Sequence, residues 1–179
     1  PFTLSTMSIC SIEDVARNTE KPFWFQLYTM KDTGFVNSLI DRAKAAKCSA
    51  LVITLDLQIL GQRHRDLKNG LSAPPKPTFK NIIDLSTKWS WGLEMLQTKR
   101  RSFGNIVGHV SGVSDTSSLS EWTQTQFDPA LDWDKISKIK EYWGGKVILK
   151  GILDKEDAKM ALKVGADAMI VSNHGGRQL

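Results

Sequence analysis

The sequence predicts an α/β fold built on a parallel sheet, because short apolar runs alternate with amphipathic helical segments along the chain. The apolar runs have the length and composition of strands that are buried on both faces. The segments between them are long enough to form the crossover helices that parallel strands require. At 179 residues the chain has the length of one domain and can bury a sizeable core.

The first half of the chain supplies three predicted strands, at residues 2–5, 23–28 and 51–55. Between the first two strands, Ser11 followed by Asp14 is typical of a capped helix start. Between the second and third strands, residues 33–47 form a predicted amphipathic helix. Its apolar face comprises Phe35, Val36, Leu39, Ile40 and Ala43.

The second half continues the alternation, with predicted strands at residues 146–150 and 168–172. Asp132 is positioned to cap a helix whose apolar residues are Trp133, Ile136, Ile139 and Trp143. Another helix is predicted at residues 154–164, between the last two strands. The whole chain therefore repeats one strand–helix unit, apart from a single long interruption.

That interruption is residues 57–131, which far exceed the length of an ordinary connection between a strand and a helix. It contains a proline-rich stretch at residues 74–77, a short helix predicted near residues 91–99 and a Gly- and Ser-rich stretch at residues 104–120. We expect this insertion to pass over the carboxyl ends of the strands as a lid or docking element. A mobile loop without a role is the alternative interpretation.

Charge and cysteine content exclude several classes of protein. The 24 Lys and Arg residues outnumber the 19 Asp and Glu residues, but they are scattered, and the sequence contains no nucleic-acid-binding motif. A net charge of +5 suits anionic ligands or an anionic membrane surface, and equally an ordinary solvated surface. Cys10 and Cys48 lack metal-type spacing, so we expect no metal site and a reduced, cytoplasmic location.

Polar side chains gather at the carboxyl ends of the predicted strands, where an α/β barrel places its active site. Alternation along the strands turns them to a common side. They are Gln26, Tyr28, Thr54, Asp56, Lys150, Ser172 and His174. Each has an ordinary structural explanation when it is taken singly. Buried polar groups are costly unless they are paired, so a ring of them indicates a polar ligand.

The sequence Ser-Asn-His-Gly-Gly-Arg-Gln-Leu at residues 172–179 resembles the signature of the FMN-dependent α-hydroxy acid oxidases and dehydrogenases, a family that includes L-lactate dehydrogenases and glycolate oxidases. Phe-Gln-Leu-Tyr at residues 25–28, Leu-Gly-Gln-Arg at residues 60–63 and Lys-Gly at residues 150–151 match the family in order and spacing. The resemblance covers essentially the whole chain. It implies a partial (β/α)8 TIM barrel, with strands two to six present and the long insertion after the third of them.

The resemblance further implies oxidation of an L-2-hydroxy acid, above all L-lactate, to the 2-keto acid with FMN as cofactor. His174 would be the base that takes the hydroxyl proton as a hydride passes to the flavin. Asp56 would pair with the resulting imidazolium. Lys150 would stabilise negative charge on the reduced flavin. Tyr28 would hydrogen-bond the substrate and complete the catalytic group.

Substrate and flavin binding are also implied residue by residue. Arg177 would grip the substrate carboxylate through its two-pronged guanidinium, and Arg63 would help to hold the same anion. The residues implied to bind the flavin are Ser5, Gln26, Thr54, Lys150 and Ser172. One departure from the family lies just after Asp56, where Leu57-Gln58 stands in place of the Thr-Pro of many relatives.

The family pattern also contains strands that this sequence lacks, among them those that hold the FMN phosphate. We therefore expect residues 1–179 to be the central portion of one FMN-binding barrel domain. We also expect the complete protein to be a homo-oligomer. The electron acceptor stays open between a quinone, a cytochrome and oxygen. A peroxide-forming 2-hydroxy acid oxidase and a non-catalytic half-barrel that serves as an assembly module are the alternative functions; another kind of FMN barrel lacks support.

The insertion carries a cluster of aromatic and basic residues, namely Lys88, Trp89, Trp91, Lys99, Arg100 and Arg101. Such a mixture suits a peripheral contact with the anionic inner face of the cell membrane. The competing interpretation packs both tryptophans under a lid and leaves the cations solvated. No apolar run is long enough to cross a bilayer.

Overall fold

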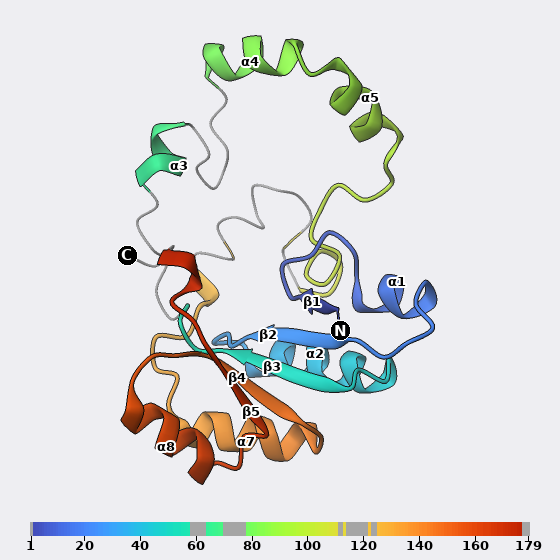
Figure 1. Cartoon of the computed structure of the whole chain (residues 1–179). Coiled ribbons are helices and arrows are strands. Elements are labelled where there is room, and N and C mark those ends of the chain that lie inside the picture. Colours follow the sequence, from blue (N-terminus) through green and yellow to red (C-terminus); the bar gives the residue numbers. More distant parts are fainter. Residues whose placement is uncertain are drawn as a thin grey trace.

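The computed structural model describes residues 2–57, 64–69, 78–110, 113, 122 and 125–176. Their centre is a parallel sheet in the order β1-β2-β3-β4-β5, in which each strand pairs with its neighbour in sequence (Figure 1). The strands are β1 (Thr3–Ser5), β2 (Trp24–Tyr28), β3 (Ala50–Thr54), β4 (Val147–Ile152) and β5 (Ala168–Val171). All five predicted strands are confirmed, with ends that differ from the prediction by one or two residues.

The two faces of the sheet bury different neighbours. Every second strand residue belongs to the main core beneath the helices, and these residues are Phe25, Leu27, Leu51, Ile53, Val147 and Leu149. The alternate residues Ala50, Val52 and Ile148 form a smaller cluster with Trp24 on the opposite face. Because side chains alternate along a strand, Gln26, Thr54 and Lys150 point to this second face as well.

The carboxyl ends of the first four strands lie in register. Ser5 pairs with Gln26, Tyr28 pairs with Thr54, and Thr54 pairs with Lys150. In a parallel sheet this register brings residues from distant parts of the sequence to one edge. Strand pairing therefore brings together the part of the predicted polar ring that lies on the strands, namely Gln26, Tyr28, Thr54 and Lys150.

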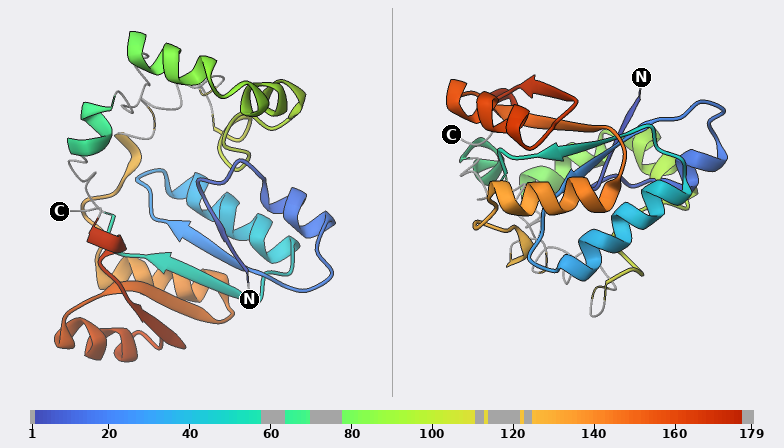
Figure 2. Two further views of the ribbon diagram at one scale, coloured as in Figure 1. Left: turned by 45° about the horizontal axis from the view of Figure 1, so that its top comes forward. Right: turned by 90° about the horizontal axis from the view of Figure 1, so that it is seen from below.

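Two helices begin at the caps that the sequence predicts, Ser11 and Asp132. In α1 (Ile12–Arg17), the Ser11 hydroxyl accepts from the Asp14 backbone N–H, and the Asp14 carboxylate accepts from the Ser11 N–H. The helices α2 (Thr33–Ala45), α7 (Trp133–Trp143) and α8 (Lys155–Lys163) each follow an aspartate whose carboxylate accepts a backbone N–H. Figure 2 shows α2 and α7 side by side on one face of the sheet. The five apolar residues predicted to line α2 are all buried.

The insertion forms α3 (His64–Lys68), α4 (Phe79–Ser86) and α5 (Trp89–Gln97) in its first part. Helix α5 matches the short helix predicted near residues 91–99, whereas α4 was not anticipated. Thr78 caps α4 by accepting from the Asn81 N–H. Figure 1 shows α4 and α5 standing apart from the sheet. These two helices form the arm, defined here as residues 79–97.

The last part of the insertion returns to the core rather than covering it from outside. Asn105 and Ile106 are fully buried, and Phe127 pairs with Met30 in an antiparallel bridge. The Asn105 carboxamide accepts from the Ile12 N–H at 2.9 Å and donates to the Ser5 carbonyl at 3.3 Å. The stretch after the arm is thus fixed beside the carboxyl end of β1.

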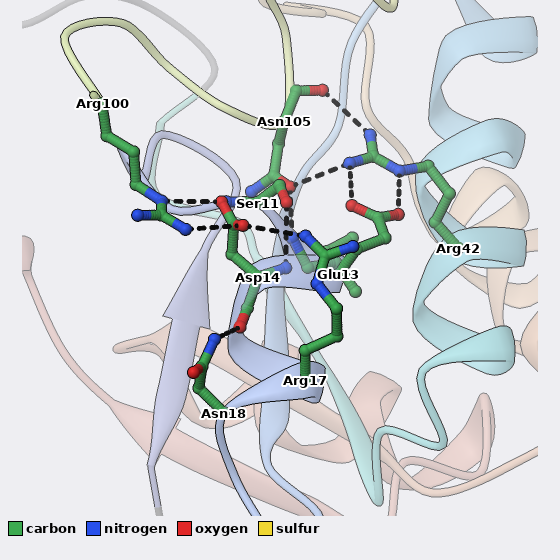
Figure 3. A network of polar contacts seen from close by, with 9 residues as sticks. Ser11, Glu13, Asp14, Arg17, Asn18, Arg42, Arg100 and Asn105 are labelled. Carbon is green, nitrogen blue, oxygen red and sulfur yellow. Dashed lines mark hydrogen bonds and ion pairs between the residues drawn. The ribbon is translucent and has the colours of Figure 1, made fainter.

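Figure 3 shows the ion pairs that surround Asn105. The Arg42 guanidinium donates to both Glu13 carboxylate oxygens, at 2.7 and 2.8 Å, and to the Asn105 carbonyl at 3.1 Å. This bidentate contact lowers the pKa of Glu13 to about 2. Nearby, Arg100 donates to the Asp14 carboxylate at 2.8 and 2.9 Å, which holds the pKa of Asp14 far below its ordinary value. The base of the arm is therefore tied to α1.

Candidate active site

A ladder of hydrogen bonds crosses the ends of β1, β2 and β3. The Ser5 hydroxyl donates to Gln26 Oε1 at 2.9 Å, and Gln26 Nε2 donates to Thr54 Oγ1 at 2.8 Å. Gln26 and Thr54 are buried. The second Gln26 amide proton and the Thr54 hydroxyl proton have no acceptor among the described residues. Buried donors of this kind require a partner, so the ladder offers hydrogen bonds to a bound molecule.

The carboxylate of Asp56, which follows β3, contacts side chains at the ends of β4 and β5. Its Oδ1 lies 2.8 Å from His174 Nδ1, and its Oδ2 lies 3.4 Å from Lys150 Nζ. The exposed fractions of the Asp56, His174 and Lys150 side chains are 11%, 21% and 24%. The three groups therefore lie together in a mostly desolvated cluster, where electrostatic interactions are stronger than in water.

The contacts of Asp56 assign the tautomer of His174. Lys150 Nζ also lies 3.5 Å from His174 Nδ1, but an ammonium and a protonated ring nitrogen cannot donate to each other. The shorter contact to the carboxylate places the proton on Nδ1. Nε2 then carries the lone pair and has no partner among the described residues. The histidine is thereby oriented as a proton acceptor.

The turn that carries His174 is left-handed. His174 has φ 60°, and Gly175 and Gly176 follow with φ 68° and 72°. A non-glycine residue in this conformation costs on the order of 1–3 kcal/mol, so it persists only where its surroundings fix it. Two contacts do so, because the His174 N–H donates to Ser172 Oγ at 3.1 Å and the ring is held by Asp56. The glycines let the chain turn back so that the imidazole faces the strand ends.

The other predicted site residues are placed as follows. Tyr28 ends β2 beside Thr54, and its ring meets Phe127 edge to face at a centroid distance of 5.8 Å. Ser172 follows β5 and caps the His174 turn. Arg63 and Arg177 lie outside the described residues. Their predicted contacts with the substrate carboxylate stay predictions.

These residues fit the ring of FMN. The ladder supplies donors and acceptors for the polar edge of a flavin ring, and the Lys150 ammonium supplies a positive charge at the same sheet edge. His174 stands at that edge too, held by Asp56 at 2.8 Å. The donor set therefore suits a planar, electron-accepting heterocycle together with a small substrate that has a hydroxyl group to deprotonate.

A family model described as FMN-dependent dehydrogenase matches residues 1–179. The chain belongs to the FMN-dependent dehydrogenase family. L-lactate dehydrogenases of Ectopseudomonas mendocina (strain ymp) and Haemophilus influenzae (strain PittEE) are each 43% identical to it. Both comparisons cover all of this chain and 47% of the relative. The chain thus spans about half the length of these relatives, and the family resemblance seen in its motifs is confirmed.

Similar solved structures confirm the fold. The monotopic membrane protein (S)-mandelate dehydrogenase is 34% identical and superposes with a TM-score of 0.91, over all of this chain and 47% of that one. A mandelate oxidase is 32% identical with a TM-score of 0.71, over all of this chain and 42% of that one. The five parallel strands are therefore part of the barrel of this FMN-dependent family, as predicted.

Two residues of the site region escaped the sequence analysis. Asn105 holds the end of β1, but its partners lie far away in the sequence, and an isolated Asn in a Gly- and Ser-rich stretch resembles a turn residue. Gly151 was noted only as part of a Lys-Gly motif. Its left-handed conformation, with φ 107°, depends on a bulge that no local pattern announces.

Proposed function

We propose that the protein containing this chain oxidises an L-2-hydroxy acid, most of all L-lactate, to the 2-keto acid with bound FMN. The observation that carries the proposal is the 2.8 Å contact between His174 Nδ1 and Asp56 Oδ1, which leaves Nε2 as a proton acceptor at the strand ends. The L-lactate dehydrogenase names of the relatives support the same reaction.

The proposed chemistry divides among the residues as follows. His174 Nε2 accepts the proton of the substrate hydroxyl, and the Asp56 carboxylate stabilises the imidazolium that forms. FMN, when bound, accepts the two electrons of the oxidation. Lys150 lies at the sheet edge where its charge stabilises an electron-rich ring. Tyr28 donates a hydrogen bond to the substrate.

The remaining predicted residues bind and orient. Ser5, Gln26 and Thr54 hold the flavin edge through the ladder, and Ser172 fixes the turn beside it. Arg177 and Arg63 hold the substrate carboxylate, because a guanidinium binds a carboxylate through two parallel hydrogen bonds. Fixing the carboxylate selects acids over simple alcohols.

The test uses the full-length protein with its flavin. Under anaerobic conditions, L-lactate should bleach the flavin absorbance and yield one pyruvate per flavin, whereas D-lactate should leave the spectrum unchanged. A flavin that L-lactate and other L-2-hydroxy acids do not reduce would refute the oxidation. A purified protein without flavin absorbance would favour the non-catalytic half-barrel instead.

The same assay identifies the preferred substrate and the electron acceptor. L-lactate is proposed over mandelate because the relatives named L-lactate dehydrogenase are 43% identical, against 34% for the mandelate dehydrogenase. The values of kcat/KM for the two acids decide between them. Dye or quinone reduction without oxygen uptake indicates a dehydrogenase, and stoichiometric hydrogen peroxide indicates the alternative oxidase.

We further propose that the arm places the protein on a membrane surface. Eight of its large apolar side chains are at least half exposed, namely Phe79, Ile82, Ile83, Leu85, Trp89, Trp91, Leu93 and Leu96. So many exposed apolar side chains on two short helices are unusual on a water-facing element. No helix among the described residues is long and apolar enough to cross a bilayer. The name of the mandelate dehydrogenase neighbour, a monotopic membrane protein, supports a surface contact.

Two of the cations predicted to face the membrane make contacts within the protein. Arg100 is engaged by Asp14, and Arg101 donates to the carbonyls of Thr98 and Leu96, so neither guanidinium is a simple solvated charge. The apolar arm is therefore the main determinant. Vesicle co-sedimentation of the full-length protein should fall when Trp89 and Trp91 are both changed to Ser and stay unchanged in Trp133→Phe, a control outside the arm. Equal binding by the arm variant and the wild type would leave the arm as a lid.

A further inference from the structure

Strand β4 contains a bulge at its carboxyl end. Lys150 pairs with Ile170, but the next pair is Ile152 with Val171, so Gly151 is an extra residue without a partner in β5. Gly151 has φ 107°, a backbone conformation that residues with a Cβ rarely adopt. The bulge falls directly after the lysine of the site.

The missing side chain of Gly151 makes room for Asp56. A Cβ added to Gly151 would lie 2.8 Å from the Asp56 Cβ and 2.9 Å from its Cγ. It would also lie 3.0 Å from the Asp56 backbone nitrogen. The obstacles are the root of the side chain and the backbone, which cannot swing away as the tip of a long side chain can. Any residue other than glycine therefore has to displace Asp56.

Asp56, the residue that would be displaced, contacts both His174 and Lys150. The Leu55 N–H donates to the Lys150 carbonyl at 2.8 Å, which fixes the chain on both sides of the contact. Asp56 then reaches His174 with one oxygen and Lys150 with the other. With a side chain at residue 151, the Asp56 Cβ has to move from 2.8 Å to at least 3.4 Å, where ordinary van der Waals contact begins, and this shift is passed on to both contacts.

We propose that Gly151 is a positioning residue of the active site, because its bulge and bare backbone set the Asp56 carboxylate between His174 and Lys150. Its importance for turnover rests on the proposed function. Its effect on geometry and stability does not, so the two can be tested separately.

The geometric test is a stability cycle on the full-length holoenzyme. Gly151→Ala should lower the Tm clearly more than Gly144→Ala, since Gly144 is also left-handed, at φ 70°, but its added Cβ meets nothing closer than 4.0 Å. An Asp56→Gly background removes the clash with the Asp56 Cβ and Cγ, while the close backbone nitrogen and the positive φ of residue 151 remain. There Gly151→Ala should cost clearly less than it does in the wild-type background. An equal cost of Gly151→Ala in both backgrounds would overturn the proposal.

The functional test measures kcat, KM and flavin content together. Gly151→Ala should retain FMN, keep KM within a few fold, and lose about 10²-fold in kcat, since a misplacement near 1 Å costs about that much. Gly144→Ala should keep its kcat. A crystal structure of Gly151→Ala should show His174 Nδ1 and Asp56 beyond hydrogen-bond distance.

The outcomes distinguish the two claims. Unchanged contacts of Asp56 in the crystal structure, or a kcat within a factor of three of the wild type, would overturn the positioning role. If the wild type oxidises no 2-hydroxy acid, the proposed function fails, while the stability cycle and the crystal structure still decide on Gly151. If Gly151→Ala does not fold, recovery of folding in the Asp56→Gly background supports the proposal, and its absence refutes it.

Discussion

Replacing Asp56 by Asn tests the proposed mechanism most directly, because the change keeps the shape of the side chain and removes only its charge. In the proposed reaction an imidazolium forms on His174, whose Nδ1 lies 2.8 Å from Asp56 Oδ1. The variant retains a hydrogen-bonding group at that distance. The difference between the two proteins therefore measures the value of the negative charge.

The magnitude follows from the geometry of the cluster. Charge centres about 4 Å apart attract by about 4 kcal/mol at an effective dielectric constant of about 20. The side chains are only 11% and 21% exposed, so solvent screening is limited. A neutral hydrogen bond from Asn restores about 1 kcal/mol. The remaining loss of about 3 kcal/mol corresponds to a fall in kcat of roughly 10²-fold. Lys150, left without its carboxylate, adds repulsion in the same direction.

The assay is steady-state oxidation of L-lactate by the full-length protein, with flavin content measured by absorbance. Asp56→Asn should bind FMN as the wild type does and turn over roughly 10²-fold more slowly. Glu156→Gln serves as a control, because that exposed carboxylate pairs with Lys159 on α8 and with no other cation among the described residues. A loss below about fivefold in Asp56→Asn would refute an imidazolium stabilised by this carboxylate.

Three further predictions concern the base and the network around the arm. His174→Gln should keep its flavin spectrum but lose about 10²-fold or more in turnover, which spectra and steady-state rates together determine; activity near wild type would remove the base role. Asn105→Ala should destabilise the protein by about 1–3 kcal/mol, because the buried Ile12 N–H loses its acceptor, and denaturant midpoints should show a smaller effect for the exposed Asn18→Ala. Glu13 has its pKa lowered from an ordinary 4.5 to about 2, so its contact with Arg42 stabilises the fold above pH 4.5 and is lost as the pH falls towards 2. The stability deficit of Glu13→Gln in denaturant titrations should therefore be full at pH 6 and shrink towards pH 2; a deficit that does not depend on pH would contradict the role of the ion pair.

Local sequence patterns predicted most of the helices and strands. The Ser11 and Asp14 pair forms the expected capping box, and the apolar stripe of α2 is buried as predicted, because both depend on residues three or four positions apart. The missed helix α4 also carries a local signal, because Phe79, Ile82 and Ile83 stand at the helical spacing i, i+3 and i+4 and Thr78 caps the first turn.

The sequence by itself determined which residues stand at the strand ends. When parallel strands pair in chain order, their carboxyl ends lie along the same side of the sheet. Alternation along the strands then turns Gln26, Thr54 and Lys150 to one face. The motif around His174 adds the base and the family. This information is local because strand length, side-chain alternation and turn chemistry are properties of a few neighbouring residues.

Only the tertiary structure decided how these groups meet. The tautomer of His174 follows from an Asp56 contact across 118 positions of sequence, and the space for Asp56 follows from a bulge at Gly151. Asn105 finds its partners Ile12 and Ser5 at similarly long range. Such contacts depend on sub-ångström packing between separate elements. That packing is set by the whole core at once, so no segment of the sequence contains it alone.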